Sequence, residues 1–147
     1  MKDAIIIHCS ATRAEQDITA ADIESWHRAR GFWTIGYGHL CDPNHPPITE
    51  SEAENYLAQD LQTALRATLR YCPVLATESV DRLAAIVDFT FNLGAGRLQS
   101  STLRRRINQR DWSAAGTELG RWVRGGGRVL PGLVLRRQAE SVMLLAL

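Results

Sequence analysis

The sequence has no apolar run long enough to cross a membrane. A spanning helix needs about 20 mainly apolar residues, whereas the apolar stretch near the N-terminus, Ala4 to Ile7, has four residues and follows Asp3. The same stretch is too short for the core of a secretory signal peptide. We therefore expect a cytoplasmic chain without a signal peptide or membrane span, which another factor must release if it works outside the cell.

Cysteine is scarce, and its spacing excludes the common cysteine-based sites. Cys9, Cys41 and Cys72 are an odd number, and no two of them form the Cys-x-x-Cys pair that is typical of structural zinc sites. We expect reduced thiols, no bound metal and no cofactor. The sequence also lacks internal repeats and low-complexity segments. Its 147 residues, 45% hydrophobic and 22% charged, predict a single domain over residues 1–147, present as a monomer.

The net charge of +1 conceals a gradient along the chain. Residues 1–60 carry 4 basic and 10 acidic side chains, whereas residues 101–147 carry 9 basic and 3 acidic ones. A basic C-terminal part suits attraction to an anionic polymer, such as a bacterial wall or nucleic acid. We do not expect nucleic acid, because the basic segment has no recognisable binding motif and few aromatic side chains to stack on bases. Solvated helix faces are the simpler alternative for any single arginine.

The sequence pattern predicts an α+β fold that is mainly helical. We expect a strand over residues 4–9, a helix over residues 19–31, and a β-hairpin over residues 32–40. Thr49 and Glu52 form a capping box that opens a long helix, which ends at Pro73. Further helices are expected over residues 79–92 and 102–108, from Asp111 onward, and from Pro131 to Leu147. Gly125 to Gly127 is expected to be a flexible joint.

Four motifs in one order give the strongest signal in the chain. They are WTIGYGH (residues 33–39), FTFNLGAG (89–96), SSTL (100–103) and GGRVLPGL (126–133), the last followed by Arg136 and Arg137. With these motifs, residues 33–147 resemble phage-type lysozymes, the endolysins of glycoside hydrolase family 24. The resemblance implies a lysozyme-like helical body over residues 32–147. It also implies a peptidoglycan hydrolase that cleaves between N-acetylmuramic acid and N-acetylglucosamine.

The catalytic residues that the resemblance implies are only partly present. In that family a glutamic acid protonates the leaving oxygen, and an aspartate or cysteine acts with the hairpin threonine on the attacking water. Thr34 matches the threonine. Counting back without gaps, the aspartate or cysteine position is Arg28 and the glutamate position is Thr19, and neither side chain can replace a carboxylic acid. Glu24 is therefore the first candidate for a replacement acid, and Asp22 and Glu15 come next. A solvated Glu24 that balances Arg28 is the simpler interpretation.

The resemblance also implies residues that bind the saccharide. Leu40, Phe91, Ser101 and Thr102 fall near the substrate cleft of the family. The helical spacing of Phe91 is equally typical of a plain core residue. The residues that the resemblance implies for binding peptidoglycan are therefore present, whereas two of those that it implies for cleavage are missing.

The N-terminal segment has a second resemblance. HCSAT (residues 8–12), Ala21-Asp22-Ile23 and WHRARG (residues 26–31) are similar to the start of a zinc N-acetylmuramoyl-L-alanine amidase. His8 matches a zinc ligand of that family, but no histidine lies beyond His45, and catalytic zinc needs three protein ligands. The sequence is therefore interpreted as a hybrid, with an amidase-like segment over residues 1–31 and a junction within residues 31–38.

Three functions follow from these resemblances. The first is a lysozyme-like muramidase that is weakened or dependent on Glu24, with peptidoglycan as its partner. The second is a catalytically silent protein that binds the wall or has only a structural role. The third is a zinc amidase of the muramoyl–L-alanine bond, built on His8. Clearing of permeabilised cells, saccharide binding and zinc-dependent release of stem peptides distinguish the three.

Overall fold

The computed structural model describes residues 33–146 and begins with a short β-hairpin. Strand β1 (Trp33–Ile35) pairs antiparallel with β2 (His39–Cys41), which confirms the hairpin expected near residues 32–40. The turn passes through Gly36, whose φ of +58° favours glycine. A Cβ atom at Gly36 would lie 2.9 Å from the Cβ of Ala53, so glycine also allows the turn to approach the next helix. The strand and helix expected before residue 32 lie outside the described residues.

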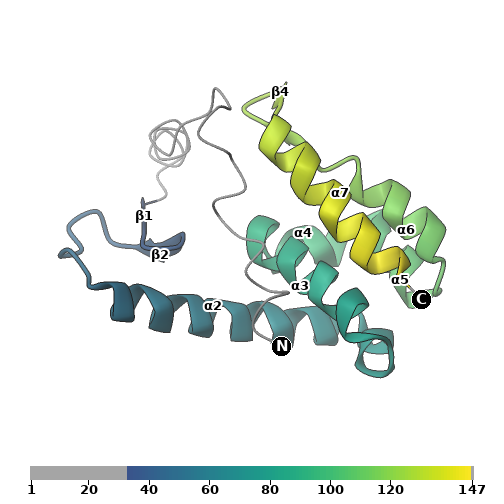
Figure 1. Ribbon diagram of the computed structural model, residues 1–147, viewed down its shortest axis with the longest axis horizontal. Helices are drawn as coiled ribbons and strands as arrows, with labels where there is room; N and C mark the ends of the chain where they lie inside the picture. Colours follow the sequence, from purple (N-terminus) through teal and green to yellow (C-terminus); the bar gives the residue numbers. More distant parts are fainter. Residues whose placement is uncertain (1–32, 147) are drawn as a thin grey trace.

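Helix α2 (Glu50–Tyr71) connects the hairpin to the rest of the molecule. It begins with the expected capping box, in which the Thr49 hydroxyl accepts from the Glu52 amide and the Glu52 carboxylate accepts from the Thr49 amide. Its 22 residues span about 33 Å. Figure 1 shows the hairpin beside the first half of α2, and α3 and α4 beside the second half. The long helix therefore joins a small β part to a helical body.

The helical body follows the pattern expected from the sequence, with one additional helix. Pro73 ends α2 and begins a short 3-10 helix, η1 (Pro73–Thr77). Ser79 caps the following helix with its hydroxyl, and Asp111 caps a later one with its carboxylate. Pro131 occupies the first turn of the last helix. The helices are α3 (Val80–Leu93), α4 (Ala95–Ser100), α5 (Thr102–Asn108), α6 (Trp112–Leu119) and α7 (Pro131–Leu145).

The core is centred on α3, which packs against α2 and α7, and it also includes buried side chains of η1, α4, α5 and α6. Phe89 is fully buried and meets Trp122 edge to face at 5.4 Å between ring centroids, a favoured arrangement of aromatic rings. Cys72 is also fully buried, and this burial raises the pKa of its thiol to about 12, so the thiol is unreactive at neutral pH. The other fully buried apolar residues are Leu75, Ala85, Ile86, Leu98, Leu103, Ile107, Ala115, Leu119 and Leu144.

One sequence expectation for the body was wrong, and one α-helix was not expected. Helix α3 ends at Leu93 with Gly94 as its C-cap, and the unexpected helix α4 begins directly afterwards at Ala95. The glycine run was taken as a flexible joint, but it forms a second hairpin of β3 (Arg124–Gly125) and β4 (Arg128–Val129). Gly126 and Gly127 have φ of +56° and +82°, which are the positive values that a tight two-residue hairpin turn requires. Adjacent glycines therefore act here as turn residues.

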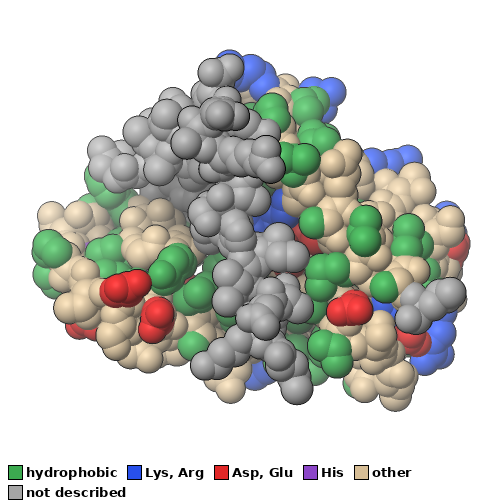
Figure 2. Space-filling model, in the orientation of Figure 1, with side chains coloured by type: hydrophobic (Ala, Val, Ile, Leu, Met, Phe, Trp, Pro, Cys, Tyr) green, Lys and Arg blue, Asp and Glu red, His purple; other side chains and the backbone are tan. Residues whose placement is uncertain are grey.

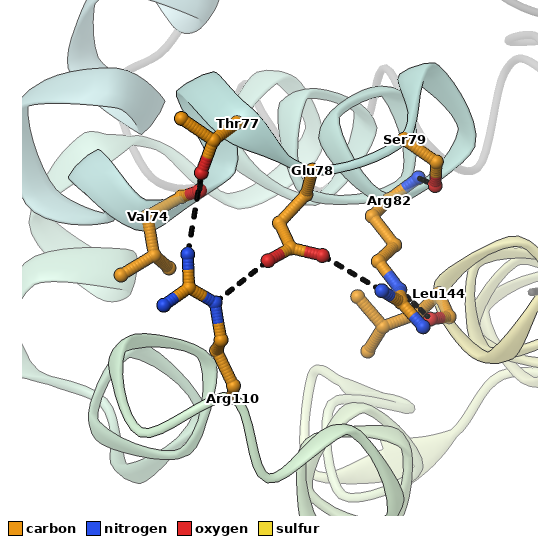
Figure 3. Close-up of polar contacts among 7 residues, drawn as sticks. All are labelled: Val74, Thr77, Glu78, Ser79, Arg82, Arg110 and Leu144. Atoms are coloured by element: carbon orange, nitrogen blue, oxygen red, sulfur yellow. Dashed lines mark hydrogen bonds and ion pairs between the residues drawn. The ribbon is translucent and has the colours of Figure 1, made fainter.

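Glu78 joins three segments that are distant in the sequence. Its carboxylate accepts from Arg82 and Arg110, each at 2.7 Å (Figure 3). Arg110 also donates to Thr77, and Arg82 donates to the carbonyl of Leu144 at 3.1 Å. These bonds connect the start of α3 with the loop before α6 and with the end of α7. Arg110 holds a left-handed backbone conformation, with φ of +56°.

We expect Glu78→Gln to lower the midpoint of thermal unfolding at pH 7. Hydrogen bonds from Arg110 and Arg82 lower the pKa of the Glu78 carboxyl below its usual value of 4.5. A lowered folded-state pKa gives stability that is present above the unfolded pKa and is lost as the pH falls through the folded one. The loss in Glu78→Gln should therefore shrink on acidification below pH 4.5. The matched control is Glu54→Gln, because Glu54 is exposed on α2, and equal midpoint shifts in the two variants would contradict the assignment.

Candidate functional site

The first hairpin has two faces with different surroundings. Side chains that lie opposite each other in an antiparallel pair share a face, and successive residues alternate between faces. Nδ1 of His39 donates to the Asp60 carboxylate at 2.9 Å, and the His39 ring stacks on Tyr56 with 4.2 Å between the ring centroids. Both partners belong to α2. The face that carries His39 and Ile35 is therefore the one covered by α2.

Thr34 and Leu40 occupy the opposite face of the hairpin. They are direct partners in the pairing of β1 with β2, so their side chains lie side by side and point away from α2. Thr34 is half-buried, whereas Leu40 is 61% exposed. An exposed leucine beside a threonine hydroxyl is suited to contact a ligand that has both apolar and hydroxyl groups. The structure thus places together the predicted catalytic threonine and one predicted saccharide contact.

The other predicted saccharide contacts form a second group, on the helical body. Phe91 is half-buried near the end of α3. Ser101 is 7% exposed, and its hydroxyl donates to the Leu98 carbonyl and accepts from the Arg104 amide. This capping role occupies the Ser101 hydroxyl, so its contact with saccharide stays a prediction. Thr102 is half-buried, and its hydroxyl accepts from Arg105 at 3.1 Å.

The predicted replacement acid, and the residues counted at the two positions where the resemblance implies catalytic groups, are not in the described part of the chain. Glu24, Thr19 and Arg28 lie before residue 33, as do His8 and Cys9 of the amidase-like motif. Over residues 33–146, no three His, Cys, Asp or Glu side chains are grouped so that they could hold a metal ion. None of the helices in the same range is long and apolar enough to cross a membrane.

A buried ionic cluster connects α3 and α7, and sequence reasoning missed it. Arg137 and Glu140 are 1% and 2% exposed, and their charged groups are 2.7 Å apart. Arg137 also donates to Asn92 at 2.9 Å and lies over the ring of Phe89. Arg136 binds Asp88 through two hydrogen bonds of 2.7 and 2.8 Å. The sequence signal was present as two adjacent arginines followed by a glutamate on one helix.

The cluster is incompletely hydrogen-bonded. Nε and Nη1 of Arg137 have no hydrogen-bond partner among the described residues, and neither carboxyl oxygen of Glu140 has one of good geometry. Burial raises the pKa of the Glu140 carboxyl, and the neighbouring Arg137 guanidinium opposes that rise. A buried guanidinium has no comparable way to become neutral. Removal of Glu140 should therefore cost more stability than removal of Arg137, because the Glu140 carboxyl can become neutral and the Arg137 guanidinium cannot.

A family model confirms what the four motifs and the hairpin indicate. The model of phage lysozyme matches residues 17–140, which is most of the sequence and includes all the elements from β1 to the greater part of α7. The chain belongs to the phage lysozyme family. The hairpin with Thr34, the capped helix α2 and the α3–α7 core therefore lie within the matched region.

Individual relatives agree with this assignment. The phage lysozyme chain is 37% identical over 116 residues to an endolysin of Bacillus phage B103, of which it spans 43%. It is 34% identical over 128 residues to an endolysin of Acyrthosiphon pisum secondary endosymbiont phage 1, of which it spans 85%. Among solved structures, the muramidase domain of SpmX from Asticaccaulis excentricus is 25% identical, with a TM-score of 0.69 over 89% of this chain and 99% of that one. The mainly helical, lysozyme-like α+β fold is thus confirmed.

The amidase-like interpretation of the N-terminal segment gains no support from these comparisons. The phage lysozyme model begins at residue 17, within the 1–31 segment that was assigned to an amidase. Residues 17–31 can therefore be counted with the lysozyme family, and a junction within residues 31–38 is not supported. Gly36 and Tyr37, which belong to the WTIGYGH motif, lie in the turn of the first hairpin.

Proposed function

We propose that this chain is a peptidoglycan hydrolase with weakened cleavage of the bond between N-acetylmuramic acid and N-acetylglucosamine. The observation that carries the proposal is the hairpin face on which Thr34 and Leu40 lie side by side, within a region that matches phage lysozyme. The relatives named endolysin and the muramidase domain support the same class of substrate. This chain spans 43% of the first of these relatives, so the activity is proposed for the present chain on its own residues.

The weakening follows from two positions in the sequence. A threonine at position 19 and an arginine at position 28 replace the two acidic or nucleophilic groups that the family resemblance implies. Glu24 is the replacement that we propose as general acid, because it is an upstream carboxylate on the segment that leads into the hairpin. To act at neutral pH it needs a raised pKa, and a cationic Arg28 nearby would oppose that rise. The catalytically silent wall-binding protein is therefore the second candidate.

The proposed cleavage of the glycan uses no cofactor. Thr34 would orient the attacking water, and Leu40, Phe91, Ser101 and Thr102 would contact the glycan. We propose that the chain works as one domain and as a monomer. It would reach the wall after release from the cytoplasm.

The test compares the parent with Glu24→Gln and Thr34→Ala on purified peptidoglycan. We expect slow release of reducing sugar ends by the parent and a fall of about 100-fold or more in each variant, because general acid catalysis and water positioning each contribute on this scale. Glu54→Gln is the control, since it removes one exposed carboxylate from α2 without touching the hairpin. Melting curves establish that each variant is folded.

The possible results test the role of Glu24 and distinguish the candidate functions. Unchanged cleavage in Glu24→Gln eliminates Glu24 as the acid. An absence of cleavage by the parent, together with binding of chitin-type saccharides that is lost in Leu40→Ser, supports the silent wall-binding protein. Release of stem peptides that requires zinc supports the amidase instead.

A further inference from the structure

One face of α5 forms a small cationic pocket. Thr102, Arg105, Arg106 and Gln109 are three, four and seven residues apart, so they share a face of the helix. These four residues line a shallow pocket of about 160 Å³. Leu103 and Ile107, on the opposite face, are fully buried. The core thus fixes α5 in the orientation that presents both guanidinium groups to solvent.

The arginines around this pocket have few carboxylate partners. The segment from residue 89 to residue 110 contains five arginines and no aspartate or glutamate. Arg105 donates to the Thr102 hydroxyl, and Arg97 is exposed on α4, which packs against α5. Arg106 has a carboxylate partner in Asp111, with 3.4 Å between Nη1 of Arg106 and Oδ2 of Asp111. In the face seen in Figure 2, basic side chains lie over the helical body and not over the first hairpin.

The two helices that carry this surface, α4 and α5, contain no aromatic side chains. Residues 94–110 contain no Phe, Tyr or Trp, and Phe89 and Phe91, just before them, are buried and half-buried. Proteins that bind single-stranded nucleic acid combine positive charge with exposed rings on which bases stack. The composition of this surface therefore fits a polymer that has repeated negative charges and no bases.

We propose that Arg97, Arg105 and Arg106, with Thr102 and Gln109, form a docking surface for a phosphodiester-linked polyol polymer of the bacterial wall. Guanidinium groups bind phosphate through two parallel hydrogen bonds, and arginines on two adjacent helices can engage successive phosphates of one strand. Hydroxyl and amide groups in the pocket supply neutral hydrogen bonds to the polyol. Thr102 belongs to this surface and is also a predicted glycan contact. The surface would therefore hold the chain on the wall beside its proposed substrate. Docking does not require cleavage.

The test measures binding of the full chain to poly(glycerol phosphate) at several salt concentrations. We expect Arg97→Gln/Arg105→Gln to bind at least about tenfold more weakly at low salt and to show a smaller salt dependence, because fewer phosphates are neutralised. Arg106 is left unchanged because its partner Asp111 caps α6. The matched control is Arg124→Gln/Arg128→Gln, which removes the same charge from exposed positions on the second hairpin. Thermal unfolding of both variants establishes that they are folded.

Two competing polymers complete the test. Weaker binding of poly-glutamate than of poly(glycerol phosphate) supports phosphate recognition, whereas equal binding overturns it in favour of general anion attraction. Tighter binding of oligothymidylate would overturn it in favour of nucleic acid. An equal loss in the control variant would also overturn the assignment to α4 and α5. Cleavage of peptidoglycan stripped of phosphate polymers is measured separately, so this proposal and the proposed hydrolase activity can fail independently.

Discussion

Glu140→Leu is expected to destabilise the folded chain by about 3–5 kcal/mol at pH 7, which is the usual cost of removing one partner of a buried ion pair. The substitution would leave the Arg137 guanidinium in a site that is 1% exposed, with Asn92 as its remaining hydrogen-bond acceptor. Because arginine stays protonated in proteins, the charge cannot be avoided by titration. Urea unfolding followed by far-UV circular dichroism measures the change.

The reverse substitution should cost less. Arg137→Met leaves Glu140 with only the longer contact to Arg136, at 3.8 Å, but a carboxyl group can take up a proton, and burial already raises the pKa of Glu140. The double variant Arg137→Met/Glu140→Leu should recover most of the lost stability, because apolar side chains of similar size often replace buried ion pairs without loss. Arg128→Met, at an exposed position, is the control. A larger loss in Arg137→Met than in Glu140→Leu would refute the asymmetry, and additive losses in the double variant would refute the pairing.

The second large effect concerns catalysis. Thr19→Glu/Arg28→Asp should raise the rate of glycan cleavage by about 100-fold or more, since it restores carboxylates at the two positions that lie 15 and 6 residues before Thr34. Arg28→Asp also removes a cation that would oppose positive charge on the sugar ring. The rate of reducing-end release from purified peptidoglycan is the measurement.

An isosteric control separates carboxylate chemistry from improved folding. Thr19→Gln/Arg28→Asn introduces amides of the same size, which cannot donate a proton at a useful pKa. This control should stay at the parent's rate. If both double variants cleave equally fast, or if neither exceeds the parent, then Thr19 and Arg28 do not occupy the positions of the missing groups.

The parts of the fold that depend on local chemistry could be predicted from the sequence. The capping box at Thr49 and the proline at the start of α7 each use contacts within one helical turn, and both were predicted. The second hairpin was missed because consecutive glycines are compatible with both a mobile joint and a tight turn. Only the pairing of β3 with β4 distinguishes these cases, and that pairing depends on tertiary structure.

The candidate site could also be predicted from the sequence only in part. The motif around Thr34 was sufficient to predict the hairpin, and the register then places Leu40 beside Thr34. Periodicity could not assign Phe91 to core or cleft, and the structure leaves it half-buried. The pairing of Arg137 with Glu140 was not predicted. Its burial follows from the packing of α7 on α3, which no local pattern reveals.

The bonds at Glu78 predict how these positions vary among related sequences. One carboxylate serves both Arg82 and Arg110, and Arg110 adopts a left-handed backbone conformation that costs a non-glycine residue about 1 kcal/mol or more. A relative without an acidic residue at position 78 lacks the ion pair that favours arginine at position 110. Glycine or asparagine should then replace that arginine, because either residue accepts the same backbone more easily. Positions 78, 82 and 110 are therefore expected to covary, although more than 25 residues separate the first two from the third.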